Sequence, residues 1–245
     1  MIHEYPYETA LTTALANFIV RAIQTTLKIQ DRFTLVLSGG NTPKMLYHKL
    51  ASPAWASAIP WEKIHIFWGD ERYVPHDDER NNAKMAFDTL LNKVKIPPFN
   101  IHRMRTDIPI AESVKEYEKT LHTYFTFHKT FDLVLLGLGE DGHTLSLFPG
   151  SKVLDDKRSW VCAVEDVDPK RVTLMPEVVN ASSLIVFLVM GKEKSEILRR
   201  VTEGYDAAEY PAQMITPDER SLHWFVTPQL TPVNSTLPPN SPSNS

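Results

Sequence analysis

Apolar residues gather into four short runs along the chain. The runs are FTLVL at 33–37, KIHIFWG at 63–69, DLVLLG at 132–137 and SLIVFLVMG at 183–191. Each is rich in aliphatic, β-branched or aromatic residues and is followed by glycine or polar residues, which is the pattern of strands buried on both faces. We therefore predict four core strands.

Segments with helical periodicity lie between these runs. Residues 7–28 place apolar side chains three and four positions apart, which predicts an amphipathic helix. A second helix is expected over 42–51, with Thr42 as its N-cap and Pro43 as its first residue. Further helices are predicted at roughly 82–92, 114–125 and 192–201. Strands that alternate with helices form β-α-β units, so the fold class is α/β, with a mostly parallel sheet and helices on both faces.

Length and composition indicate one folded unit and a tail. With 245 residues, 42% of them hydrophobic and 23% charged, the chain fits a single large α/β domain, which we place at residues 1–230. Residues 231–245 read TPVNSTLPPNSPSNS and contain almost no apolar side chains. Such a segment cannot bury enough apolar surface to fold, so we predict that it is disordered.

Charge, hydropathy and cysteine content argue against several classes of function. The net charge is −4 and no long basic run is present, which argues against sequence-independent nucleic-acid binding. The longest apolar stretch, LIVFLVM at 184–190, is too short to span a bilayer, and no signal-peptide pattern is visible. The single cysteine, Cys162, cannot form an internal disulfide and is expected to be a packed thiol. We therefore expect a soluble, cytoplasmic protein.

The segment GLGEDGH at 137–143 contains the G-x-G-x-x-G pattern of dinucleotide-binding turns. In those turns a crossover helix of about ten or more residues follows the last glycine. Here only HTLSLF precedes Pro149 and Gly150, a dipeptide that ends a helix. A dinucleotide cofactor is therefore not expected.

The histidine that ends this segment is the better candidate for chemistry. His143 lies among glycines that leave room for a ligand, at the carboxyl end of a predicted strand and shortly after Glu140 and Asp141. Imidazole can accept and return a proton, so we predict that His143 is a general base. The nine histidines show neither H-E-x-x-H nor C-x-x-C spacing, so no metal site is predicted.

A second glycine-rich segment, SGGNTP at 38–43, follows the first predicted strand. Gly39 and Gly40 allow a tight turn and close approach of a ligand, and Asn41 and Thr42 lead into the next predicted helix. Backbone N–H groups at a helix start attract anions and oxygen-rich ligands. An ordinary strand-to-helix turn would use the same residues, so the segment alone is compatible with either role.

Three charged residues stand where the second predicted strand ends, in GDERYVP at 69–75. Neighbouring residues of extended backbone point to opposite sides, so Asp70 and Arg72 should share a side, with Glu71 opposite. Arg72 could form two parallel hydrogen bonds to a phosphate or carboxylate. A solvated run of surface charges is the alternative interpretation.

Two later basic positions are further candidates. Arg171 opens RVTLMPEVVNAS, and Lys194 lies in GKEKSE after the last predicted strand. Lys194 would lie in the first turn of a helix, where a cation opposes the helix dipole, so an anionic ligand would explain its presence. An exposed helix lysine is the alternative.

Together these segments resemble the 6-phosphogluconolactonases. They occur, with YPAQMI and LHWFVT, in the family's order over about residues 10–227, and GDERYVP with G-x-G-x-D-G-H-T-x-S-L-F-P is a specific pair. The resemblance implies a Rossmann-like α/β fold without a dinucleotide. It also implies hydrolysis of 6-phosphogluconolactone to 6-phosphogluconate in the oxidative pentose phosphate pathway, with no metal or other cofactor. Leu145, where the family commonly has Ala, and Asn81-Asn82, where Ser-Asn is usual, depart from the pattern.

The resemblance also implies catalytic roles. His143 would activate the attacking water, supported by Asp70 or, as second choice, by Asp141. Backbone N–H groups of the glycine loops, which include Gly139 and Gly142, or the side chain of Arg72 would stabilise the oxyanion.

The same resemblance implies how the substrate, a small-molecule phosphosugar lactone, is held. Arg171 and Lys194, with Arg72, would bind its phosphate, and the loop from Gly39 to Thr42 would hold the sugar or phosphate end. We expect a monomer or small homo-oligomer. Two other functions stay open: an amino-sugar phosphate deaminase or isomerase, whose motif has Asp-Glu-Tyr where this chain has Asp-Glu-Arg, and a non-catalytic sugar-phosphate-binding protein.

Overall fold

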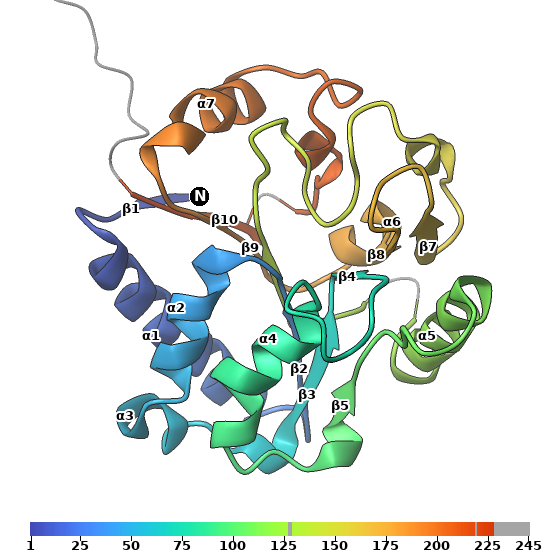
Figure 1. Ribbon diagram of the computed structural model, residues 1–245. Helices are drawn as coiled ribbons and strands as arrows, with labels where there is room; N and C mark the ends of the chain where they lie inside the picture. The colour runs from blue at the N-terminus through green and yellow to red at the C-terminus, as the bar shows by residue number, and fades with distance from the viewer. Residues whose placement is uncertain (127–128, 219, 228–245) are drawn as a thin grey trace, which may run out of the picture.

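A parallel sheet runs through the middle of the molecule in the computed structural model, which describes residues 1–126, 129–218 and 220–227 (Figure 1). Its strands follow the order β1-β10-β9-β6-β2-β3-β5, and each neighbouring pair is parallel. The strands are β1 (Ile2–Glu4), β2 (Phe33–Leu37), β3 (Ile64–Trp68), β5 (Ile101–His102), β6 (Leu133–Leu136), β9 (Ile185–Val189) and β10 (Leu222–Val226). The predicted α/β fold with a mostly parallel sheet is confirmed.

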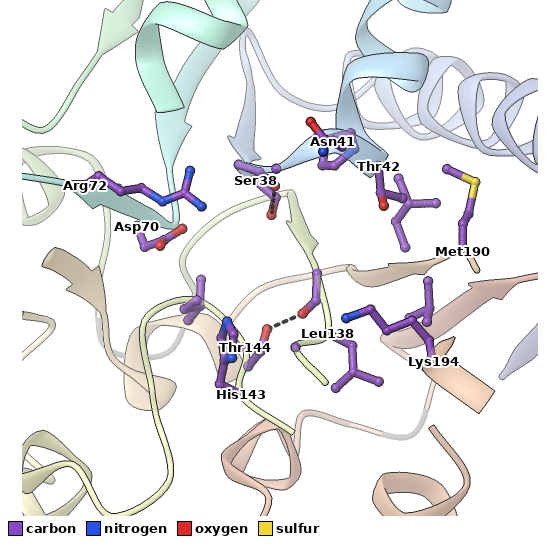
Figure 2. Close-up of a pocket in the computed structure, with 18 residues that line it drawn as sticks. Ser38, Asn41, Thr42, Asp70, Arg72, Leu138, His143, Thr144, Met190 and Lys194 are labelled. Atoms are coloured by element: carbon purple, nitrogen blue, oxygen red, sulfur yellow. Dashed lines mark hydrogen bonds between the residues drawn. The ribbon is translucent and has the colours of Figure 1, made fainter. Parts of the chain in front are cut away.

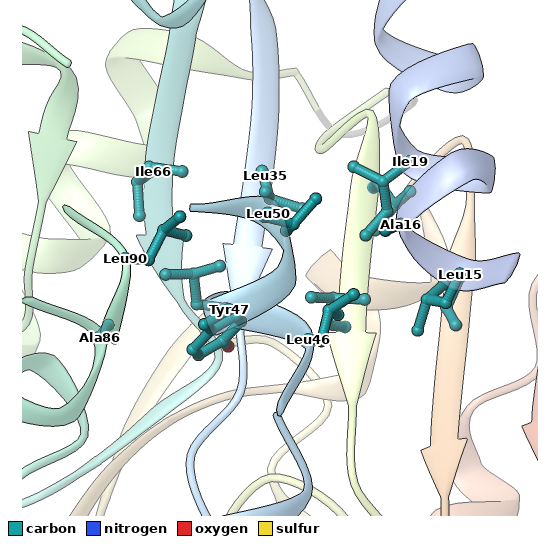
Figure 3. Close-up of a cluster of buried hydrophobic side chains, with 14 of the residues drawn as sticks. Leu15, Ala16, Ile19, Leu35, Leu46, Tyr47, Leu50, Ile66, Ala86 and Leu90 are labelled. Atoms are coloured by element: carbon teal, nitrogen blue, oxygen red, sulfur yellow. The ribbon is translucent and has the colours of Figure 1, made fainter. Parts of the chain in front are cut away.

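Helices cover both faces of this sheet. On one face lie α1 (Glu8–Thr26), α2 (Asn41–Leu50), α3 (Pro53–Ala56) and α4 (Asn82–Thr89), and on the other lie α5 (Ile110–Tyr124), α6 (Pro176–Asn180) and α7 (Ser195–Glu203). The alternation of side chains along each strand divides the core accordingly. Leu35 (Figure 3) and Leu37 of β2 pack with the first group of helices. Val36 packs with the second group. Both faces are apolar, which explains the uninterrupted hydrophobic runs in the sequence.

A second, antiparallel sheet of three strands stands beside the first and was not predicted. It consists of β4 (Asp70–Arg72), β8 (Arg171–Leu174) and β7 (Val161–Val164), in that order. Only Gly69 separates β3 from β4, so the chain passes directly from the large sheet into the small one. Its first strand is the charged triplet DER, which carries no hydrophobic signal.

The bounds of the predicted helices differ by a few residues from those observed, and two of the differences concern how a helix begins. The α2 helix begins at Asn41 with Gly40 as its N-cap, so the prediction of Thr42 as N-cap is wrong. Gly40 can take this place because its φ of 96° is accessible to glycine at little cost. The segment predicted as helix over 192–201 begins instead as the 3₁₀ turn η5 (Lys192–Lys194), which leads into α7.

Short 3₁₀ helices connect the larger elements. They are η1 (Trp61–Lys63), η2 (Leu91–Lys93), η3 (Pro98–Asn100), η4 (Lys152–Asp155), η5 and η6 (Pro211–Met214).

Two tyrosine hydroxyls hydrogen-bond to the backbone at the carboxyl ends of the neighbouring strands β2 and β3. The Tyr47 hydroxyl of α2 accepts from Ser38 N at 2.9 Å and donates to Ser38 O at 2.7 Å. From the other face, the Tyr117 hydroxyl of α5 makes the same two bonds to Trp68, each at 2.9 Å. The strand β5 ends before Trp68, so the hydroxyl takes the place of a ladder partner. Burial raises the pKa of both tyrosines and keeps them neutral.

The predictions about membrane spans and about the C-terminal tail can be compared with the structure. In the described part of the chain, no helix has the length and apolar character that crossing a membrane requires. The tail predicted as disordered, 231–245, lies outside the described residues.

Cys162 is half-buried, and its thiol donates to Asp156 Oδ2 at 3.6 Å. Burial, followed by the charge of Asp156, raises the pKa of this thiol to about 12, so it is unreactive.

Candidate active site

A cavity of about 260 Å³ opens where the carboxyl ends of β2, β3, β6 and β9 meet. Figure 2 shows Asp70 and Arg72 along one side, Lys194 and Met190 along the other, the start of α2 above and the His143 loop below. The cavity brings together most of the residues nominated from the sequence, namely Gly39, Gly40, Asn41, Thr42, Asp70, Arg72, Gly139, His143 and Lys194. Ligands of open parallel sheets bind at this edge.

The loop before α2 forms the upper wall. A Cβ at Gly39 would overlap the Asn82 side chain, so this position requires glycine. No side chain caps the N–H groups of the first turn of α2. Those groups are therefore left for a ligand with oxygen acceptors, which fits the expectation for this loop.

The charged triplet of β4 has two different environments, as predicted. Asp70 and Arg72 line the cavity, whereas Glu71 is buried on the opposite side. The Glu71 carboxyl accepts from Asn82 N at 2.6 Å, Ala83 N at 2.8 Å and Arg72 N at 2.8 Å. Burial raises the pKa of Glu71 to about 8 even though these N–H groups act to lower it. Glu71 therefore fixes β4 to the start of α4 and takes no part in the cavity.

Two residues that the sequence did not nominate hold Asp70 and Arg72 in place. The buried Ser146 hydroxyl donates to Asp70 Oδ2 at 2.7 Å. Asn82 Nδ2 donates to Asp70 O at 2.9 Å, and Asn82 Oδ1 accepts from Arg72 Nη1. Asn82 is the second residue of the Asn81-Asn82 pair noted in the sequence, where it matches the Asn of the family's usual Ser-Asn, so its agreement with the family pattern was the available signal.

His143 is joined to Asp141 rather than to Asp70. The His143 Nδ1 atom lies 2.5 Å from Asp141 Oδ1, and His143 N donates to the same oxygen at 3.2 Å. Burial acts to raise the pKa of Asp141, but the hydrogen bonds and charge of His143 outweigh it and hold that pKa below its usual value. The carboxylate therefore remains ionised and can fix the imidazole with its proton on Nδ1.

The glycines around His143 shape its loop. A Cβ at Gly139 would overlap the imidazole, so the ring can occupy its place only over glycine. Gly142, at φ 81°, packs against Tyr210 and does not line the cavity. The N–H groups of Gly139 and Gly142 donate to His143 O at 2.8 Å and Gly139 O at 3.2 Å. Because both N–H groups are already bonded within the loop, they are poorly placed to serve an oxyanion.

The two later basic residues lie in different places. Lys194 lines the cavity at the end opposite Asp70, and its Nζ lies 3.7 Å from Glu140 Oε1. Arg171 lines an adjoining cavity and stands directly opposite Arg72 in the β4–β8 ladder. The structure thus does not bring Arg171 and Lys194 into one cavity.

Leu145 is the non-glycine residue with a positive φ, 56°, among those the structure describes. Its side chain lines the cavity and lies so close to Gly69 that a Cβ there would come within 2.6 Å of Leu145 Cδ2. The strained residue is held from both sides, because Thr144 Oγ1 donates to Gly137 O at 2.8 Å and Ser146 N donates to Thr173 Oγ1 at 3.2 Å. Leu145 therefore forms a fixed apolar part of the cavity wall.

The loop does not continue into a crossover helix. Residues 144–147 form a small bridge, and the next helical element is the 3₁₀ turn η4. The rejection of a dinucleotide turn from Pro149 and Gly150 is therefore consistent with the observed course of the chain. Among the described residues, no group of three or more His, Cys, Asp or Glu side chains is arranged to hold a metal ion.

Comparison with known proteins identifies the family to which the chain belongs. It is 38% identical to the 6-phosphogluconolactonase of Nostoc sp. over 90% of this chain and 92% of that protein. It is 41% identical to that of Synechocystis sp. over 80% and 82%. A solved 6-phosphogluconolactonase structure from Thermotoga maritima covers 93% of this chain and 98% of its own, with a TM-score of 0.79 and 31% identity. The sequence model of the glucosamine-6-phosphate isomerases/6-phosphogluconolactonase family matches residues 6–224, and the chain belongs to that family.

Proposed function

We propose that this protein is a 6-phosphogluconolactonase, which hydrolyses 6-phospho-D-glucono-1,5-lactone to 6-phospho-D-gluconate in the oxidative pentose phosphate pathway. The observation that carries the proposal is the His143–Asp141 pair, 2.5 Å apart, at a cavity that also presents Arg72 and Lys194. The names of its relatives in Nostoc and Synechocystis support the same activity. The cavity combines a base for water with cations for a phosphorylated substrate.

In the proposed reaction His143 acts as a general base. With its Nδ1 proton donated to Asp141, the imidazole has Nε2 free to take a proton from water as the water oxygen attacks the lactone carbonyl. The C–O bond to the ring oxygen then breaks, and the imidazolium returns the proton to that oxygen. A lactone is an activated ester, so no covalent intermediate with the enzyme is needed. We assign Asp141 the orienting role and Asp70 an electrostatic role near the reacting carbonyl.

The cations and the α2 start would hold the substrate. Lys194 and Arg72 flank the cavity and are placed to bind phosphate or to stabilise the oxyanion, with the N–H groups of Gly40 to Thr42 as further donors. The bonds that Gly139 and Gly142 already make favour this assignment over an oxyanion hole within the His143 loop. Arg171 contributes to the adjoining cavity.

The remaining features of the proposal concern setting and assembly. We propose one catalytic domain over residues 1–230, without a cofactor, acting as a monomer or small homo-oligomer. The single, half-buried cysteine fits a reducing cytoplasmic location.

A direct assay tests the activity. The lactone is generated with glucose-6-phosphate dehydrogenase, the protein is added, and acid release is followed against the spontaneous rate, with His143→Ala as control. Acceleration that the control lacks supports the proposal, and no acceleration by the native protein contradicts it. Ammonia release from glucosamine 6-phosphate would instead indicate a deaminase. Binding of 6-phosphogluconate without turnover would indicate a binding protein.

A further inference from the structure

A second cavity, of about 360 Å³, adjoins the candidate active site. The two cavities share the start of α2 and the side chain of Arg72 in their walls. The remaining walls of the second cavity bring three more cations together with Arg72, namely Lys44, Arg80 and Arg171. Glu79 is the acidic residue that lines it.

The positive charge in this cavity is poorly compensated. Arg72 and Arg171 stand directly opposite each other in the β4–β8 ladder, an arrangement that destabilises a sheet when the charges are alike. Neither guanidinium forms an ion pair with a carboxylate in the part of the chain that the structure describes. Glu79 is drawn away, because its Oε1 lies 3.0 Å from Lys84 Nζ.

The neighbouring acids offset this positive charge only in part. The charges of Asp70 and Glu71 act to raise the pKa of Arg171, but burial and the charge of Arg72 outweigh them. The Glu71 carboxyl is buried on the opposite side of β4, where its oxygens accept three backbone N–H groups. Asp70 faces the first cavity, where it accepts the Ser146 hydroxyl. Arg80 is already paired with Asp78 at 2.7 Å, which leaves Arg72, Arg171 and the exposed Lys44 without an ion pair among the residues that the structure describes.

Among the described residues, the guanidinium of Arg171 has N–H groups without an acceptor and no ion-pair partner. The side chain is half-buried, and burial, followed by the charge of Arg72, lowers its pKa. Its bonds to the backbone oxygens of Pro169 and Lys170 are both made by Nη1. Among the described residues, Nε and Nη2 have no partner. An arginine fork that is partly removed from water with an unused edge is suited to two parallel bonds to phosphate oxygens.

We propose that this cavity is a second anion-binding site, which takes the phosphate group of a small phosphorylated molecule other than the substrate. An anion there would relieve the repulsion between Arg72 and Arg171, with Lys44 as third ligand. Because Arg72 lines both cavities, an occupant would contact the residue that also faces the lactone. The inference rests on the proposed function only in assigning the substrate's own phosphate to Lys194.

Anion stoichiometry tests the proposal. Inorganic phosphate and, separately, glycerol 3-phosphate are titrated into the full chain and followed by ³¹P NMR and calorimetry. We expect two binding events in the native protein and one in Lys194→Gln. The remaining event should weaken about tenfold or more when Lys44→Gln and Arg171→Gln are added to Lys194→Gln, since each removes a charge-assisted hydrogen bond. Tighter binding of the ester than of free phosphate would identify an organic phosphate as occupant, and equal binding would identify free phosphate.

A matched control separates the site from general positive charge. Lys93→Gln and Lys95→Gln remove two exposed lysines that line neither cavity, and in the Lys194→Gln background they should leave the event unchanged. Loss of all phosphate binding in Lys194→Gln would overturn the proposal, as would equal weakening by the control pair. A single event in the native protein that survives Lys194→Gln but needs Arg171 would also overturn it, because the substrate's phosphate would then use this cavity. Thermal unfolding confirms that each variant is folded, and the lactone assay is scored separately.

Discussion

The large parallel sheet and the small antiparallel sheet meet at Gly69 but serve different purposes. Strands β2, β6 and β9 are buried along their whole length and carry almost only aliphatic and aromatic side chains. Strand β4 consists of three charged residues, and β8 begins with Arg171. The large sheet supplies stability and an edge for loops, whereas the small sheet presents charge to the two cavities. Function is concentrated where the two meet.

The largest expected effect is on the His143 loop, which follows β6 of the large sheet. His143→Ala should lower kcat by about 10²–10⁴-fold with a much smaller change in KM, because the base acts in the transition state. Steady-state lactone hydrolysis at several substrate concentrations measures both constants. His48→Ala, on the exposed part of α2, is the control. A kcat within about threefold of the native value would show that this loop does not supply the base.

The second prediction compares stability in the two sheets. Leu35→Ala in β2 and Leu174→Ala in β8 remove the same atoms from fully buried positions. Both should cost about 2–5 kcal/mol of unfolding free energy, with Leu35 near the upper end, because the centre of the large sheet can relax least around the cavity. Urea unfolding gives the values. A larger loss at Leu174 would mean that the small sheet is the more rigid of the two.

The third prediction concerns which sheet provides the histidine's partner. Asp141→Asn removes a charge-assisted bond to His143 Nδ1 and should lower kcat by about 10–100-fold. Asp70→Asn, on the small sheet, leaves that bond intact and should lower kcat less. Rates for the two variants under the same conditions decide the order. The reverse order would return the orienting role to Asp70.

The fourth prediction tests the strain at the junction. Leu145→Gly and Leu145→Ala lose nearly the same apolar surface, but only glycine adopts a φ of 56° without steric cost. Relief of about 1–2 kcal/mol of strain exceeds the roughly 0.5–1 kcal/mol entropic cost of glycine, so Leu145→Gly should be the more stable variant by about 0.5–1 kcal/mol. Chemical unfolding of both measures the difference. Greater stability of the alanine variant would mean that the loop relaxes around residue 145.

The smallest effect is expected at β5, the edge strand of the large sheet beside β3. Burial, followed by the charges of His65 and Arg32, lowers the pKa of His102 to about 4. Between about pH 4 and 6.5 the unfolded chain therefore binds more protons than the folded chain, so His102 makes stability fall as pH falls. His102→Gln should reduce this loss relative to the native protein across that window, measured by urea unfolding at each pH. An unchanged difference between the two proteins from pH 4 to 7 would contradict the assignment.

The contrast between the sheets also explains what the sequence could predict. Strand β2 was predicted with its observed bounds, because its hydrophobic run is buried on both faces. Strand β4 was missed because its residues are charged, and β1, with three mostly exposed residues, shows no pattern. Short strands at sheet edges are defined by their partners, which local sequence does not reveal.

The sequence could predict which residues line the candidate site but not which of them contact one another. Position after a strand identified Asp70, Arg72, His143 and Lys194, since parallel strands bring their carboxyl ends to one edge. Whether Asp70 or Asp141 contacts the histidine depended on a loop conformation. The separation of Arg171 from Lys194 depended on the small sheet, which the sequence did not predict.

The tyrosine hydroxyls at Ser38 and Trp68 have a consequence for how this scaffold can change. Because Tyr47 and Tyr117 complete the hydrogen bonding at the ends of β2 and β3, those two strands end at fixed residues. Substitutions of cavity-lining side chains in SGGNTP and GDERYVP would therefore alter the lining of the cavities and leave these backbone hydrogen bonds in place. The residues that line the cavities at these two positions can thus change while the ends of β2 and β3 stay where they are.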